Sequence, residues 1–223
     1  MESINEQLVE RIDRYIEDLF TPADAALLEN LKDADAAGLP AINVSPNQGH
    51  LLYLLAKIAG AKRVLEIGTL GGYSTTWLAR ALPRGGVLIT LERELKHAEV
   101  ARRSLERAGL GSIVEIRVGP ASGSLRDLIR SGAEPFDVIF IDADKTGYVE
   151  YLDLSLQLSH PGTIILADNV IRHGKVLDEN PPDASDRGAR AYNDAIAHHP
   201  RLESLALPIV RDSVDGLAIS VVR

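Results

Sequence analysis

The 223-residue sequence contains no cysteine. A chain without cysteine forms no disulfides, and it offers no thiolate as a nucleophile or metal ligand. A disulfide-stapled fold and cysteine-based catalysis are therefore excluded. The absence favours no compartment, because cysteine-free proteins occur in oxidising and reducing surroundings alike.

Long hydrophobic runs are also lacking. No segment reaches the roughly eighteen uninterrupted apolar residues that a membrane-spanning helix needs. The first seven residues, Met-Glu-Ser-Ile-Asn-Glu-Gln, are acidic and lack the basic start and apolar run of a signal peptide. We therefore expect a cytoplasmic protein without a membrane partner.

Positive charge is in short supply. The chain has 24 lysines and arginines against 32 aspartates and glutamates, which gives a formal net charge of −8 at pH 7. Proteins that bind nucleic acid usually present a basic face to the phosphates. The acidic balance therefore argues against a nucleic-acid partner, although it leaves a local basic patch open.

What the sequence does contain is the composition of a globular protein, 45% hydrophobic and 25% charged. A chain of this length buries a sizeable core, and we expect a single domain over residues 1–223. Within it we expect an N-terminal helical extension at 1–40 and a core at 41–223.

The core alternates short apolar runs with amphipathic segments, which is typical of a parallel, doubly wound α/β sheet. The expected strands are 63–67, 86–91, 113–118, 136–141 and 163–167. The expected helices are 73–82, 95–108, 122–131, 145–158 and 189–198. Residues 171–188 are expected to form a long loop, and 201–208 and 213–222 to form two late strands that pair antiparallel at one edge.

The N-terminal 39 residues carry a helical pattern. Apolar residues recur at steps of three and four, at Ile4, Leu8, Ile12, Ile16 and Leu19. Thr21-Pro22 is expected to cap a second helix, and Ser45-Pro46 to start a third. Helices placed before a sheet in this way form a lid, a dimer contact or extra packing, and the sequence leaves all three open.

A glycine-rich turn follows the first strand. Gly68 and Gly72, in Glu66-Ile-Gly-Thr-Leu-Gly-Gly-Tyr-Ser74, let the backbone turn tightly and approach a ligand. Glu92 ends the next strand, at about the distance where an acidic residue binds ribose hydroxyls in nucleotide-binding folds. The spacing is not the dinucleotide fingerprint, and no Walker lysine follows. Taken alone, the pattern also fits a plain tight turn and a solvated glutamate.

Two buried strands end in polar residues. Asp142 and Lys145 follow the strand at 136–141, and Asp168 and Asn169 follow the next strand. If the strands are neighbours, three side-chain oxygens converge at one sheet edge, where open α/β sheets bind their ligands. Such an oxygen-only set suits a hard cation such as Mg²⁺ or Ca²⁺. The alternatives are helix caps for the two aspartates and a structural ion pair for the lysine.

Six segments carry a further signal when they are taken together. They are Val64-Leu-Glu-Ile-Gly68, Gly72-Tyr-Ser74, Phe136-Asp-Val-Ile-Phe-Ile-Asp-Ala-Asp-Lys145, Tyr148-x-x-Tyr151, Asp168-Asn169 and Asp215-Gly-Leu217. This combination resembles the cation-dependent O-methyltransferases, which include catechol and caffeoyl-coenzyme-A O-methyltransferases and their bacterial relatives. The resemblance covers nearly the whole chain from about residue 40 onward, and the two acidic blocks are its most specific part.

The resemblance implies a fold and a cofactor. The family fold is a Rossmann-like, doubly wound seven-stranded sheet, mostly parallel with an antiparallel last strand. The family cofactor is S-adenosylmethionine (SAM). Because SAM has no pyrophosphate, the resemblance would also explain the missing dinucleotide fingerprint.

The resemblance further implies residue roles. The implied cofactor-binding residues are Asn43, Val44, Glu66, Gly68, Gly72, Ser74, Glu92, Pro120, Ala121 and Asp142. Of these, Asn43 and Val44 would lie near the sulfonium, Glu66 and Gly68 along the methionine, Glu92 on the ribose, and Pro120 and Ala121 beside the adenine. The implied metal ligands are Asp142, Asp168 and Asn169, for Mg²⁺ or else Ca²⁺ or Mn²⁺. Lys145 matches the general base.

Three departures put the substrate in doubt. Val44 stands where many relatives have methionine, and the segment 211–215 lacks a glycine that often precedes the Asp-Gly pair. The loop 171–188 cannot be matched in detail, and we expect it to form one wall of the acceptor site.

We therefore expect an enzyme that transfers a methyl group from SAM to a hydroxyl of a catechol-like vicinal diol, with a divalent cation as cofactor. Lys145 would remove the proton, which requires its neutral amine. We expect a homodimer with a phenolic small molecule as substrate. The alternatives are a methyltransferase for another acceptor class and a non-catalytic SAM-binding protein.

Overall fold

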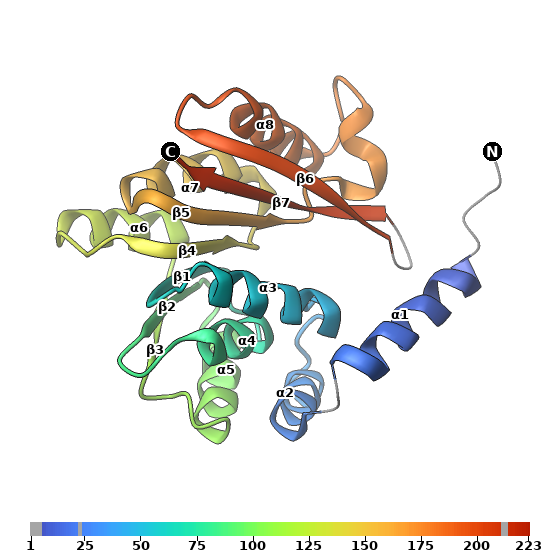
Figure 1. Ribbon diagram of the computed structural model, residues 1–223, viewed down its shortest axis with the longest axis vertical. Coiled ribbons are helices and arrows are strands. Elements are labelled where there is room, and N and C mark those ends of the chain that lie inside the picture. Colours follow the sequence, from blue (N-terminus) through green and yellow to red (C-terminus); the bar gives the residue numbers. More distant parts are fainter. Residues whose placement is uncertain (1–5, 22–23, 211–213) are drawn as a thin grey trace.

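A computed structural model describes residues 6–21, 24–210 and 214–223. Its centre is one seven-stranded sheet in the order β3-β2-β1-β4-β5-β7-β6 (Figure 1). The strands are β1 Arg63–Ile67, β2 Val87–Glu92, β3 Val114–Val118, β4 Phe136–Ile141, β5 Ser159–Asp168, β6 Leu202–Val210 and β7 Val214–Val222. The first five strands are parallel, and β7 runs antiparallel to both β5 and β6. The expected doubly wound, mostly parallel sheet is confirmed.

The central strands are apolar because both of their faces are covered. In β4, Ile139 and Ile141 pack into one hydrophobic core, whereas Val138 and Phe140 pack into a second core on the opposite face of the sheet. All four side chains are fully buried. This two-sided burial explains the continuous apolar run, which replaces the alternation of a half-exposed strand.

Helices cover both faces (Figure 1). The α-helices are α1 Glu6–Phe20, α2 Ala25–Ala36, α3 Pro46–Ile58, α4 Tyr73–Ala81, α5 Leu95–Arg107, α6 Ala121–Arg130, α7 Tyr148–Gln157 and α8 Ala184–His198. Two short 3₁₀ helices are η1 Lys145–Gly147 and η2 Arg172–Leu177. Helices α6, α7 and α8 lie on one side of the sheet, and α2 to α5 lie on the other.

Three local expectations need correction. The second helix is capped by Asp24, whose carboxylate accepts a hydrogen bond from the Leu27 amide, and not at Thr21; Pro22 lies outside the described residues. The expected loop 171–188 contains η2 and the first turn of α8, which Asp183 caps. Strand β5 begins at Ser159, because the bulged start of the strand pairs with Phe136.

The start of α3 is as expected. The Ser45 hydroxyl accepts a hydrogen bond from the Gln48 amide at 3.1 Å, and the Gln48 side chain accepts one from the Ser45 amide at 3.2 Å. This reciprocal capping box, with Pro46 in the first turn, fixes where the helix begins. It also fixes the position of Gln48, whose side-chain amide contacts Asp168.

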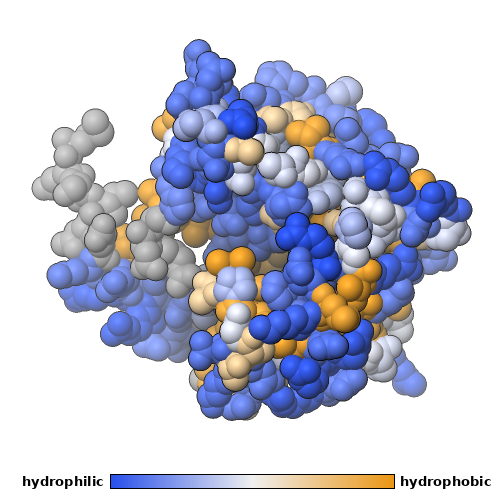
Figure 2. Space-filling view, turned by 180° about the vertical axis from the view of Figure 1, so that it is seen from behind, coloured by the Kyte–Doolittle hydropathy of each residue, from blue (hydrophilic) through white to orange (hydrophobic). Residues whose placement is uncertain are grey.

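Helix α1 projects from the body of the molecule (Figure 1). Its apolar side chains remain partly uncovered, with Leu8 50% and Tyr15 65% exposed. The first residue of the expected stripe, Ile4, lies outside the described residues. The face turned to the viewer in Figure 2 is mostly hydrophilic, with hydrophobic side chains in separate patches. Within the described ranges, no helix is long and apolar enough to cross a membrane.

Candidate active site

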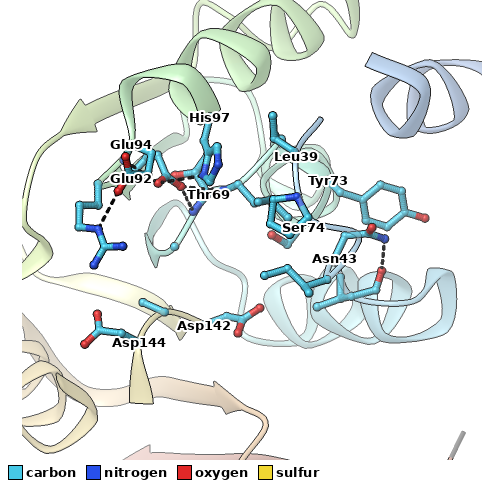
Figure 3. Close-up of a pocket in the computed structure, with 18 of the residues that line it drawn as sticks. Leu39, Asn43, Thr69, Tyr73, Ser74, Glu92, Glu94, His97, Asp142 and Asp144 are labelled. Carbon is cyan, nitrogen blue, oxygen red and sulfur yellow. Dashed lines mark hydrogen bonds and ion pairs between the residues drawn. The ribbon is translucent and has the colours of Figure 1, made fainter. Parts of the chain in front are cut away.

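The carboxyl ends of β1, β2 and β4 border a cavity of about 920 Å³ (Figure 3). Helix α2 and the segment 39–44 close it from the N-terminal side. The predicted site residues that line it are Asn43, Val44, Gly68, Ser74, Glu92, Pro120, Ala121, Asp142, Lys145 and Asn169. Glu66, Gly72 and Asp168 are not among the lining residues. One cavity therefore brings together residues from six separate parts of the chain.

Gly68 is the point at which the chain leaves β1 for the cavity. Its φ of 102° lies in the left-handed region, and a Cβ built there would collide with the carbonyl oxygen of Asp142. Both the backbone angle and this close approach of two strand ends exclude a side chain. The turn that follows ends at Gly72, which precedes the first residue of α4.

Glu92 holds this turn in place. Its carboxylate accepts hydrogen bonds from the backbone amides of Thr69 at 3.2 Å, Leu70 at 2.8 Å and Glu94 at 2.9 Å. The Nδ1 atom of His97 lies 3.5 Å from the same carboxylate, and both side chains face the cavity in Figure 3. Glu92 therefore lines the cavity and at the same time shapes its glycine-rich wall.

Glu66 lies behind that wall and is fully buried. Its carboxyl group accepts hydrogen bonds from the hydroxyls of Ser74 at 2.6 Å, Thr75 at 2.5 Å and Thr90 at 2.7 Å. Burial raises the pKa of Glu66 to about 7, although these three hydrogen bonds oppose the rise. Of the residues that line the cavity, Ser74 bonds directly to Glu66, and Thr69 is linked to it through the Thr90 hydroxyl.

The two acidic strand ends are neighbours, which is the condition on which the predicted cluster depended. Strand β4 pairs in parallel with β5, so that Ile141 lies opposite Ala167 and the following residues Asp142 and Asp168 end adjacent strands. Asn169 comes next, with a left-handed φ of 55° that asparagine tolerates better than most residues. The three predicted oxygen donors therefore lie at the same edge of the sheet.

The Asp168 carboxylate has few donors for a buried charge. The residue is 4% exposed, and the Gln48 amide approaches its two oxygens at 3.3 and 3.4 Å, which are long hydrogen bonds. Burial raises the pKa of Asp168, and the negative charge of Asp142 raises it further. Neither aspartate caps a helix in the structure. A buried, weakly satisfied carboxylate beside a second one fits a bound cation.

The donor set itself consists of two carboxylates and one amide. Within residues 6–21, 24–210 and 214–223, no group of three or more histidine, cysteine, aspartate or glutamate side chains could hold a metal ion. A cation at the strand ends would therefore depend on Asn169 as its third protein ligand. Carboxylate and amide oxygens match the preference of Mg²⁺ and Ca²⁺.

Lys145 is almost fully buried, with its amine at the cavity. Its Nζ donates hydrogen bonds to Asp142 Oδ1 at 3.1 Å and to the Tyr148 hydroxyl at 2.7 Å. The alternative role of an ion pair with Asp142 is thus present in the geometry, and Lys145 would have to lose its proton before it could act as a base. Burial raises the pKa of Tyr148 well above its usual value, so this hydroxyl keeps its proton.

Comparison with known proteins identifies the family. The O-methyltransferase family matches residues 20–220. This chain belongs to the O-methyltransferase family. A catechol O-methyltransferase of Niastella koreensis is 51% identical over 99% of this chain and 100% of its own length. One of Mycobacterium tuberculosis is 45% identical over 95% of both chains.

A solved structure supports the same assignment. The O-methyltransferase of Bacillus cereus in complex with SAH, S-adenosylhomocysteine, superposes with a TM-score of 0.96 at 46% identity, covering 98% of this chain and 100% of that one. The family, the Rossmann-like fold and the enzyme class expected from the sequence, a SAM-dependent O-methyltransferase, are confirmed.

Several contacts of this O-methyltransferase were not foreseen from its sequence. Asn30 of α2 lines the cavity and donates a hydrogen bond to the Gly71 carbonyl at 2.5 Å, so α2 braces the glycine turn. Arg172 and Ser185 also line the cavity; a wall formed by 171–188 was expected, but these two residues were not singled out. The contact between Lys145 and Tyr148 was not foreseen either, although it has a local signal, because the two residues are three positions apart in the sequence. The other contacts join helices to loops that are far away in the sequence.

Proposed function

We propose that this enzyme methylates one hydroxyl of a catechol-like vicinal diol, with SAM as methyl donor and a divalent cation as second cofactor. The observation that carries the proposal is the cluster of Asp142, Lys145 and Asp168 at the ends of β4 and β5, of which Asp142 and Lys145 line the same cavity as the glycine turn. The relatives named as catechol O-methyltransferases, at 45% and 51% identity over almost the whole chain, support the same substrate class.

SAM fits the part of the cavity between β1, β2 and β3. The glycine turn and Asn43 would hold its methionine end, Glu92 its ribose, and Pro120 and Ala121 its adenine. When bound, SAM supplies a methyl group on a positively charged sulfur. The acidic residues around this part of the cavity are electrostatically suited to that charge. The Bacillus cereus relative, solved in complex with SAH, supports SAM as the cofactor.

A divalent cation fits at the ends of β4 and β5, where Asp142, Asp168 and Asn169 would hold it. The weakly satisfied carboxylate of Asp168 is the observation that favours it. When bound, such a cation acts as a Lewis acid that makes the acceptor hydroxyl more acidic, and as a template that orients the diol.

Lys145 then performs the proton transfer. Lys145 lines the cavity and its amine contacts Asp142, so it would be within reach of a hydroxyl placed at the strand ends. Taking the proton leaves the acceptor oxygen negatively charged and nucleophilic. The remaining residues exclude water and align the two partners, which is a large part of the work in a methyl transfer.

The direct test is turnover with catechol and SAM after treatment with EDTA, followed by addition of Mg²⁺, Mn²⁺ or Ca²⁺. We expect activity to disappear with the chelator and to return to different extents with the three cations. Full activity in metal-free buffer would contradict the cation. SAM binding without turnover on catechols, caffeoyl esters or flavonoids would favour another acceptor class or a non-catalytic SAM-binding protein.

We also propose a homodimer in which α1 contributes to the contact. The support is the row of half-exposed apolar side chains on a helix that projects from the body, including Leu8, Ile12 and Leu19. Light scattering at micromolar concentration should give twice the chain mass. A monomer mass would refute the dimer and leave the methyltransferase assignment untouched.

A further inference from the structure

Tyr148 lies fully buried between the two acidic strand ends and the lysine. Its hydroxyl is 3.1 Å from the Ile141 carbonyl oxygen and 2.9 Å from the Asp168 carbonyl oxygen. The third neighbour is the Lys145 amine at 2.7 Å. One hydroxyl therefore touches β4, β5 and the predicted base at once.

The number of hydrogens fixes the direction of each bond. A phenol has a single hydrogen to donate, and carbonyl oxygens can only accept. The hydroxyl of Tyr148 therefore gives its hydrogen to the carbonyl of Ile141 or Asp168, and it accepts a hydrogen bond from Lys145. One N–H of the lysine must point at Tyr148.

The same count applied to Lys145 locates its lone pair. A neutral amine has two N–H groups and one lone pair in a tetrahedral arrangement. In the neutral form that a base requires, one N–H would point to Tyr148 at 2.7 Å and the other to Asp142 Oδ1 at 3.1 Å. The lone pair occupies the position that remains, and Lys145 is one of the residues that line the cavity.

We propose that Tyr148 is a positioning residue, which orients the amine of Lys145 so that its lone pair faces the acceptor hydroxyl. The proposal rests on the proposed role of Lys145 as base. Without the Tyr148 hydroxyl, the amine keeps one fixed hydrogen bond and rotates about its own axis. Proton transfer then competes with unproductive orientations of the same lysine.

Tyr192 provides a matched control. It is also fully buried, and its ring meets that of Tyr148 edge to face, with centroids 5.3 Å apart. Its hydroxyl has no hydrogen-bond partner among the residues that the structure describes. Tyr148→Phe and Tyr192→Phe therefore remove the same atom from the same aromatic pair, but only the first removes a contact to Lys145.

The kinetic test compares both variants with saturating SAM, catechol and Mg²⁺. We expect Tyr148→Phe to lower kcat by about 10- to 100-fold with little change in the KM for catechol, and Tyr192→Phe to keep kcat within about twofold. In a Lys145→Ala background, Tyr148→Phe should have no further effect. A further tenfold loss there would show that the hydroxyl acts through the strand ends, and would overturn the proposal.

A second readout needs no activity. In crystal structures of the two variants, the Lys145 amine should keep its contact with Asp142 in Tyr192→Phe and should shift or adopt several orientations in Tyr148→Phe. An unchanged amine in Tyr148→Phe would refute the positioning role. If the wild type fails to methylate any diol, the proposed function fails, and these structures still decide whether Tyr148 holds the lysine.

Discussion

Glu66 and Glu92, on β1 and β2, are each surrounded by three hydrogen-bond donors from the protein. Asp168, at the end of β5, has the long contacts from Gln48 and one backbone hydrogen bond, from Asn169, and Asp142 has the amine of Lys145. The half of the site proposed to hold SAM is thus electrostatically complete without its ligand. The half proposed to hold the acceptor is not, and we expect it to be completed by a cation.

The largest effect should come from Asp168→Ala. Loss of one of two carboxylates should remove cation binding. Turnover should then fall on the order of a thousandfold or more, because the cation is expected to stabilise the transition state by several kcal/mol. SAM affinity, measured by calorimetry, should stay nearly unchanged. The exposed Asp153→Ala serves as control. Turnover by Asp168→Ala at the wild-type rate would contradict the proposal that a cation completes the acceptor half of the site.

Lys145→Ala should come next. Loss of a general base typically lowers kcat by about 10²- to 10⁴-fold at neutral pH. The deficit should shrink as the pH rises, because the phenol then ionises without help. Rates measured from pH 6.5 to 10 check this, with the exposed Lys57→Ala as control. A deficit that is independent of pH would argue for an ion-pair role of Lys145.

Glu92→Ala tests the complete half of the site. It should weaken SAM binding by roughly 1–3 kcal/mol, since both a ribose contact and the support of the Thr69 and Leu70 amides are lost. Calorimetry on the folded variant measures this, and the exposed Glu99→Ala on α5 provides the baseline. Unchanged affinity would remove Glu92 from the cofactor site.

Glu66→Gln should give the smallest effect, a change in how the free energy of unfolding depends on pH. The pKa of Glu66 is raised in the folded protein to about 7 from an ordinary value near 4.5, so the folded state binds this proton more tightly. Between these values, stability therefore falls as pH rises. Relative to Glu66→Gln, the wild type should lose about 1–2 kcal/mol between pH 5.5 and 7.5 in denaturant unfolding. Parallel pH curves for the two proteins would contradict the raised pKa.

The core of the fold could be predicted from the sequence because its signals are local. The apolar run 136–141 gave β4 with its observed bounds, and Ser45-Pro46 gave the start of α3. The start of α8 was missed within 171–188, although Asp183 after two prolines is a cap signal. Its first turn carries few apolar residues, so hydrophobic periodicity alone does not reveal it.

The site was predictable where strand ends determine it. Once β4 and β5 are neighbours, Asp142 and Asp168 must lie together. The contacts of Asn30 with the glycine turn and of Gln48 with Asp168 join elements that are distant in the chain. No spacing rule predicts such contacts, because they depend on how helices pack after the sheet has formed.

Strand β7 has a consequence for the order of events during protein synthesis. It lies between β5 and β6, and its Leu217 pairs with Asp168. Strands β1 to β4 leave the ribosome well before β7. The half of the site proposed to hold SAM can therefore assemble on the growing chain while one edge of β5 is still unpaired. An unpaired apolar edge invites association with other chains. The interval before β7 arrives is therefore when a nascent chain is most exposed to aggregation and to chaperone capture.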